Sequence, residues 1–299
     1  MFFIMSGMLV YKSGVSSYGR TGRWRDFFLN RFLRIAPGIY SFAVLAPLVL
    51  VLFGAISFAS LFDFDMVIWL GSSLFLLPNY DPSIWANVGD GVINGHLYTI
   101  PAEVSFYLVV PALVLLARRW GFNLVLVAMM AIGIIGPLIG YLAGGTLESV
   151  IHHTFIERAA FFGAGMFWAK YWGKVPVRAW LVAVVAAAYI VVKVFSLSTN
   201  VVEPLEPFLI SIPLSYLVVV IGYKGPKALG RLTRKVGDLS FGTYIWHVLI
   251  IQLFIWGGWT GEWWLVPVVL ILAWIAAFIS WRLIEKPALS LKRVTTHPV

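Results

Sequence analysis

Two arginines in the stretch RDFFLNRFLRIAP, residues 25–37, have the type and spacing to bind a phosphorylated molecule. Arg31 and Arg34 are three residues apart, so they share one face of a helix. Two guanidinium groups on one face can bind phosphate oxygens bidentately, which makes this pair a candidate clamp for a phosphorylated donor. The alternative is that both arginines only anchor the basic end of a membrane span.

A carboxylate inside an apolar segment is the second candidate. In GHLYTIPAEVSFYLVVP, residues 95–111, Thr99 is placed to cap a helix that has Pro101 in its first turn. Glu103 and Tyr107 then lie at i and i+4 on one face. A carboxylate there needs a cation, water or a proton, so we expect Glu103 to act as an acid or base or to orient another group. The alternative is a carboxylate that interacts only with the helix dipole.

The third candidate is a polar stripe in VGDLSFGTYIWHVLIIQLF, residues 236–254. Asp238 is placed to cap this span, and polar side chains follow it at helical spacing: Ser240, Thr243, Tyr244 and His247. A lone histidine is more often structural, but on a polar face inside an apolar segment His247 is a candidate for function.

The remaining histidines do not form a recognisable metal-binding motif. His152 and His153 precede Glu157 and Arg158, but there is no HExxH and no third ligand, so no metal site is expected. No P-loop, dinucleotide fingerprint or nucleophile elbow is present either.

The elements that must position these residues are membrane helices. Of the 299 residues, 61% are hydrophobic and 12% charged, against about 25% charged in soluble domains. The net charge of +9 lies mostly in short loops between apolar runs, which indicates membrane orientation and not nucleic-acid binding. Without cysteine, disulfides and thiolate chemistry are excluded. We therefore expect an all-α, polytopic integral membrane protein in a lipid bilayer, with a single domain over 1–293 and a short tail, 294–299.

The charged loops predict the topology. Basic clusters, expected at the cytoplasmic face, lie at 12–34, 118–119, 170–178, 224–235 and 286–293. Acidic loops lie between them: Asp63 to Asp90, Glu148, Glu203 with Glu206, and Glu262. The two sets alternate only if the short run 66–78 is re-entrant or interfacial. The prediction is eight full crossings, from the apolar runs 37–58, 97–117, 122–143, 155–172, 178–195, 207–223, 239–256 and 264–284, with a cytoplasmic C-terminus.

The first apolar run, residues 2–11, does not fit a full crossing, since a span needs roughly 20 residues. The topology makes it run from outside to inside, with Met1 at the outer face. We therefore expect it to be a short remnant of a span whose preceding segment is missing.

Taken together, five stretches resemble the acyltransferase 3 family of integral membrane O-acyltransferases. In order, these are FFIMSGML, RFLRIAP, LYTIPAEVSFYLVVP, GDLSFGTYIWHVLI and WRLIEKPALSLKR. The order and spacing of the motifs make the resemblance specific over residues 2 to about 293.

The resemblance implies about ten helices and transfer of an acyl group, often acetyl, from cytosolic acyl-CoA to an acceptor hydroxyl. The acceptor would be an envelope or exported saccharide or lipid, and the enzyme would lie in the bacterial cytoplasmic (inner) membrane. No permanently bound cofactor is implied. The residues that match the family motifs are Arg31, Arg34, Tyr98 (where a Trp is usual), Glu103, Tyr244, His247, Glu285, Lys286 and Pro287.

One feature of the family is absent. Its first helix, which carries the histidine regarded as central to catalysis and a nearby arginine, precedes the Phe-Phe motif with which this chain starts. His96, His152 and His153 do not replace that histidine by position.

The resulting hypothesis assigns Glu103 and His247 to catalysis, and Arg31, Arg34, Tyr98, Tyr107 and Tyr244 to substrate binding. Two alternatives stay open. One is a transporter or flippase for an anionic lipid or sugar, which would use the same buried charges as a pathway. The other is a catalytically inactive fragment of the acyltransferase.

Overall fold

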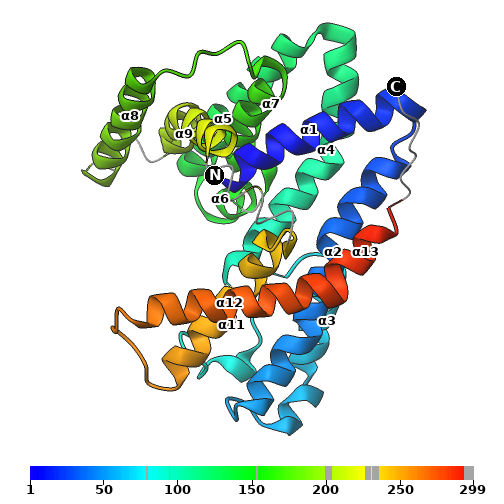
Figure 1. Ribbon diagram of the computed structural model, residues 1–299, viewed down its shortest axis with the longest axis vertical. Helices are drawn as coiled ribbons and strands as arrows, with labels where there is room; N and C mark the ends of the chain where they lie inside the picture. Colours follow the sequence, from blue (N-terminus) through cyan, green and yellow to red (C-terminus); the bar gives the residue numbers. More distant parts are fainter. Residues whose placement is uncertain are drawn as a thin grey trace. The chain divides into compact units, whose positions relative to one another are not determined.

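The computed structural model describes residues 1–78, 80–93, 95–152, 154–198, 204–225, 230 and 236–292. Regular structure in these residues is helical throughout (Figure 1). Within this part of the chain, six helices are long and apolar enough to cross a membrane: Arg25–Leu52, Gly95–Trp120, Phe122–Ala143, Ala179–Ser196, Glu206–Lys224 and Leu265–Ser290. The chain is therefore an all-α, multi-pass membrane protein, as its sequence predicts.

Every apolar run that was predicted to cross coincides with a helix. These helices are α2 (Arg25–Leu52), α4 (Thr99–Trp120), α5 (Phe122–Ala143), α7 (Phe155–Tyr171), α8 (Ala179–Ser198), α9 (Glu206–Lys224), α11 (Ser240–Trp256) and α12 (Leu265–Ser280). The 17 residues of α7 and of α11 extend about 26 Å, slightly less than the roughly 30 Å of a hydrocarbon core. The number of full crossings therefore stays a prediction.

Two short apolar runs have different outcomes. The run that begins at Phe2 does not end at residue 11, because helix α1 (Phe2–Thr21) continues to a left-handed Gly22 with φ 66°. The expected loop 12–34 is thus mostly helical. Helix α3 (Phe64–Leu74) has 11 residues, about 16 Å, and is too short to cross, in agreement with the interfacial or re-entrant segment expected at 66–78.

The chain forms two compact units, which are described separately. The first comprises Met1–Phe27 and Ala102–Pro226, and so contains α1, most of α4, α5, α6 (Gly145–His152), α7, α8 and α9. Glycines let its helices approach closely: Gly7 of α1 packs on the backbone of Phe162 in α7, and Gly133 of α5 packs on Ala160. A Cβ at either glycine would overlap its neighbour, which is typical of helix packing in membranes.

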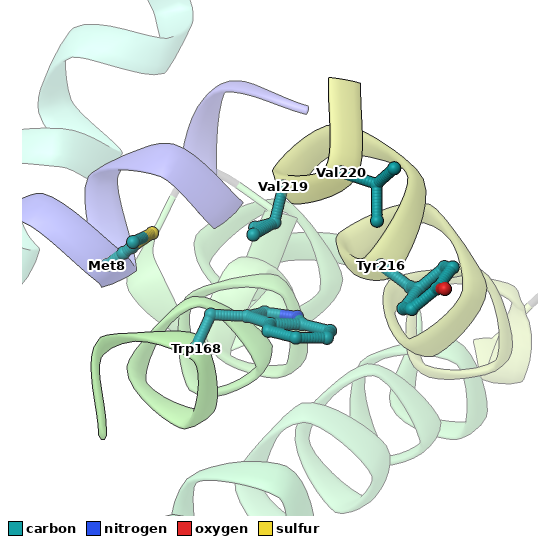
Figure 2. Packing of buried hydrophobic residues seen from close by; sticks show 5 residues of the cluster. All are labelled: Met8, Trp168, Tyr216, Val219 and Val220. Atoms are coloured by element: carbon teal, nitrogen blue, oxygen red, sulfur yellow. The ribbon is translucent and has the colours of Figure 1, made fainter. Parts of the chain in front are cut away.

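A buried cluster joins α1, α7 and α9 in this unit (Figure 2). The Trp168 ring lies 5.9 Å from that of Tyr216, and its indole N–H donates to the Ser215 hydroxyl at 2.9 Å. Met8 of α1 also belongs to the cluster. The indole nitrogen thus has a partner even though the ring is buried, as a polar group in an apolar interior requires.

The second unit comprises Phe28–Pro101 and Lys227–Val299. Besides most of α2, it contains η1 (Phe58–Phe62), α3, η2 (Ser83–Trp85), η3 (Gly95–Tyr98), α11, α12, η5 (Trp281–Glu285) and α13 (Lys286–Ser290). Gly242 of α11 packs against Ala277 of α12. Segment η5 is a π-helical turn, and such turns occur frequently near functional sites. It ends at Glu285, which is buried and accepts a hydrogen bond from Ser280 at 3.0 Å.

Candidate active site

The connection before α4 buries several of its apolar side chains, although it is a loop. Its apolar side chains are at most 1% exposed at Trp85, Val88, Ile93 and Leu97. Gln252 of α11 serves its backbone: Gln252 Oε1 accepts from Asp90 N–H at 2.8 Å, and Nε2 donates to the Val92 carbonyl at 3.0 Å. Irregular backbone is stable at membrane depth only when its polar groups have such partners.

The end of this connection meets the first turns of α11. The Tyr244 hydroxyl donates to the carbonyl of His96 and lies 2.5 Å from the Thr99 hydroxyl. The Thr99 hydroxyl also lies 3.3 Å from the His96 carbonyl, so the two hydroxyl groups and this carbonyl oxygen form one hydrogen-bonded cluster. Since Gln252 and Tyr244 are eight residues apart on α11, the loop follows that helix for about 12 Å.

His247 lies one turn beyond Tyr244 and is half-buried. Its Nδ1 is 3.0 Å from the carbonyl oxygens of Thr243 and of Tyr244. Both oxygens can only accept, so in this arrangement Nδ1 carries the proton and Nε2 is the basic nitrogen. The His96 ring stands edge-on to the His247 ring, with centroids 5.0 Å apart.

His96 is the residue that reasoning from sequence missed. By position it does not replace the family's histidine, and the sequence gives it no other expected role. Its position three residues before Thr99, the expected start of a helix, was the available signal. A residue just before a helix can reach a neighbouring helix, but the sequence does not indicate which one.

A cavity of about 630 Å³ opens beside His247. It lies between α11, α12 and the loop that joins them, and its lining is mostly apolar, with Phe254, Trp259 and Leu270 among the residues. Glu262 contributes a carboxylate to the lining. His247, which carries the basic nitrogen, therefore borders a cavity large enough for a small substrate.

Arg34 and Asp238 connect α2 to the start of α11. Arg34 Nη2 lies 2.6 Å from Asp238 Oδ2, and Asp238 Oδ1 accepts from the backbone N–H of Ser240 at 3.2 Å, as expected of a residue at this helix start. Burial would raise the pKa of the Asp238 carboxyl, but the Arg34 charge and the bonds from Ser240 outweigh it, so this pKa lies below its ordinary value.

Positive charge is concentrated around the arginine pair. Burial, followed by the charges of Arg31 and Arg34, lowers the pKa of Lys292. Three basic side chains in this second unit are thus close enough for their charges to interact. The tyrosine expected to contact substrate, Tyr98, ends η3 with an exposed side chain. The site is placed to attract an anion at the arginine pair.

Glu103 and Tyr107 occupy one face of α4 in the first unit. Glu103 is 7% exposed, and its Oε1 accepts from the Tyr107 hydroxyl at 2.5 Å. The i, i+4 relation predicted from sequence is thus present as a short hydrogen bond between buried groups. This arrangement holds the carboxyl in one orientation.

One of the other histidine candidates, His152, contacts a carboxylate. His152 Nδ1 is 2.8 Å from Glu157, and Arg158 contacts the same carboxylate. His153 lies outside the described residues. Among the residues that the structure describes, no three His, Asp or Glu side chains gather as metal ligands.

Comparison with known proteins adds independent information. A family model described as "Acyltransferase domain" matches residues 1–282. Nodulation protein 10 of Rhizobium leguminosarum bv. viciae is 29% identical, over 98% of this chain and 82% of that protein. The O-acetyl transferase of Shigella phage Sf6 is 26% identical, over 96% and 82%.

A third relative is much longer than this chain. The peptidoglycan O-acetyltransferase OatA of Listeria monocytogenes is 25% identical over 85% of this chain but only 44% of its own length. No solved structure matches the chain.

Proposed function

The chain belongs to the acyltransferase domain family, and we propose that this membrane enzyme moves an acyl group, most simply acetyl, from acyl-CoA to a hydroxyl of an envelope or exported saccharide or lipid. Two relatives named as O-acetyltransferases support the reaction type, one of them acting on peptidoglycan. The basic ends of the helices would face the cytoplasm, where acyl-CoA is present.

His247 carries the chemical part of the proposal. With Nδ1 held by the Thr243 and Tyr244 carbonyls, Nε2 accepts the proton of the acceptor hydroxyl. The hydroxyl oxygen then attacks the thioester carbonyl carbon. When the carbon–sulfur bond breaks, the imidazolium returns its proton to the leaving thiolate. The observation on which this assignment rests is the position of two carbonyl oxygens 3.0 Å from His247 Nδ1, which favours the tautomer with a free Nε2 lone pair.

Glu103 is proposed as the second catalytic residue. Its hydrogen bond from Tyr107 fixes one oxygen, so its role is to orient a substrate group or to tune a base. Tyr98, Tyr107 and Tyr244 are proposed to contact substrate.

Arg31 and Arg34 are proposed to bind the donor phosphates. The ion pair with Asp238 uses Nη2 of Arg34, whereas a guanidinium has five N–H donors. Donor phosphates would therefore be bound by the remaining donors of Arg34 together with Arg31, in the positive field that also affects Lys292.

Acyl transfer by the purified full chain, from radiolabelled acetyl-CoA to a saccharide acceptor, tests the proposal. His247→Gln should lower kcat by at least 100-fold, since general base catalysis contributes about 10²–10⁴-fold. Arg34→Ala should mainly raise KM for the donor. His152→Gln is the matched control, because His152 is an exposed partner of an ion pair.

Full activity of both His247→Gln and Glu103→Gln would overturn the assignment of the catalytic residues. Transport of a substrate by counterflow, without consumption of acetyl-CoA, would instead favour the transporter.

A further inference from the structure

A basic pocket of about 300 Å³ lies in the first unit, and none of the residues assigned above lines it. Lys12 of α1, Arg118 of α4 and Lys170 of α7 line it, together with apolar and aromatic side chains such as Val15 and Phe122. Three helices thus each contribute one cation to one pocket.

These cations have no carboxylate partner among the described residues. Within the described residues, no carboxylate lines the pocket, and none of the four ion pairs includes Lys12, Arg118 or Lys170. Three like charges in a partly apolar pocket repel one another, so an anion between them would be bound favourably.

Aromatic rings hold two of the cations in position. The Arg118 guanidinium lies 5.0 Å from the Tyr18 ring centroid, and Lys170 Nζ lies 4.4 Å from that of Phe122. Such cation–π contacts reduce the freedom of the side chains. The charges are therefore partly preorganised around the pocket.

The surroundings of the pocket indicate an amphipathic ligand. Val15 in its lining is 44% exposed, and Leu115, one turn before Arg118, is 43% exposed. Trp120, just beyond Arg118, is also exposed, as tryptophans at a membrane–water interface commonly are. In a membrane protein these apolar surfaces face lipid, while the three cations mark the level of the headgroups.

We propose that this pocket binds an anionic glycerophospholipid, with the phosphate among Lys12, Arg118 and Lys170 and the acyl chains along Val15 and the neighbouring apolar surface. Basic pockets between membrane helices bind such headgroups in general. A soluble phosphate compound such as coenzyme A presents the same charged group, but it would not use the exposed apolar rim.

The test measures lipid binding by native mass spectrometry of the full chain. Phosphatidylglycerol should bind at least tenfold more tightly than phosphatidylcholine. The single variants Lys12→Gln, Arg118→Gln and Lys170→Gln should each weaken binding about fivefold, and the triple variant on the order of a hundredfold.

Arg119→Gln is the matched control, because it removes the same charge one residue away from the pocket lining. If it weakens binding as much as Arg118→Gln, diffuse surface charge attracts the lipid and the pocket assignment is wrong. If coenzyme A displaces phosphatidylglycerol, or if the two lipids bind equally, the pocket serves a soluble phosphate or no anion. The single variants carry the test if the triple variant does not fold.

Discussion

Tyr244 connects the end of the loop before α4 to His247 in the second unit. Its hydroxyl is bonded to the His96 carbonyl and to Thr99, while its own carbonyl accepts from His247 Nδ1. One residue thus ties the end of the buried loop to the proposed base. The Tyr244 hydroxyl therefore helps to hold the position of His247. A phenylalanine, which has the ring without the hydroxyl, could not make these bonds.

Tyr244→Phe should lower kcat about tenfold. The lost hydrogen bond is worth about 1–1.5 kcal/mol, and His247 would be held less accurately in its catalytic position. Thr99→Val should have a similar effect. Since the two hydroxyls act on each other, the double variant should be little worse than either single variant. Additive losses measured in the acyl-transfer assay would show that the hydroxyls act separately.

The Arg34–Asp238 pair predicts a pH dependence of stability. Because the folded pKa of Asp238 is depressed, its contribution is complete above the unfolded value of about 3.9 and is lost as the pH falls through the lower folded value. Asp238→Asn should thus lower Tm at pH 7 by the equivalent of at most about 1 kcal/mol, since the pair is partly exposed.

Thermal unfolding of the native chain and of Asp238→Asn from pH 7 to pH 2.5 checks this sign. The two melting temperatures should converge at the acidic end. A difference that grows on acidification would contradict the ion-pair explanation.

At the scale of elements, apolar runs predicted the membrane helices well, since a run of helical length in lipid must satisfy its backbone internally. The buried loop before α4 was not predictable in the same way. Its backbone partners come from Gln252, about 160 positions away in the sequence. Residues 12–21 contain two glycines and three serines, which are typical of a loop, so the helical extension of α1 was missed.

The close packing of the loop on α11 also explains why residue 89 is a glycine. Gly89 has φ 60°, and a Cβ there would overlap the Gln252 side chain. Loop and helix therefore approach as closely as a residue without a side chain permits.

Gln252→Leu should destabilise the protein by about 1–3 kcal/mol, because it removes the hydrogen bonds to the partly buried Asp90 N–H and Val92 carbonyl, worth about 0.5–1.5 kcal/mol each. Thermal unfolding in detergent measures this loss. Gln252→Glu is the informative control, since it keeps an acceptor for Asp90 but has no donor for Val92. Unchanged thermal stability of Gln252→Leu would show that these two hydrogen bonds do not stabilise the loop.

At the scale of the whole molecule, basic residues from different predicted loops gather within each unit, and the side of the membrane that they face stays a prediction. In the first unit, members of three separate basic clusters, Lys12, Arg118 and Lys170, border one pocket. In the second unit, Arg31, Arg34 and Lys292 act on one another. Within each unit, therefore, residues expected on the same side of the membrane do lie together.

The chain contains no cysteine, so single cysteines can report which side of the membrane each loop faces. Arg119→Cys and Lys174→Cys should react with a membrane-impermeant maleimide only after the cells are permeabilised. Glu148→Cys and Glu262→Cys should react in intact cells. The pair Arg119 and Glu148 is decisive because α5 (Phe122–Ala143) alone lies between them as a candidate span. Equal labelling of these two positions in intact cells would mean that α5 does not cross, and the alternation that predicts eight crossings would then fail.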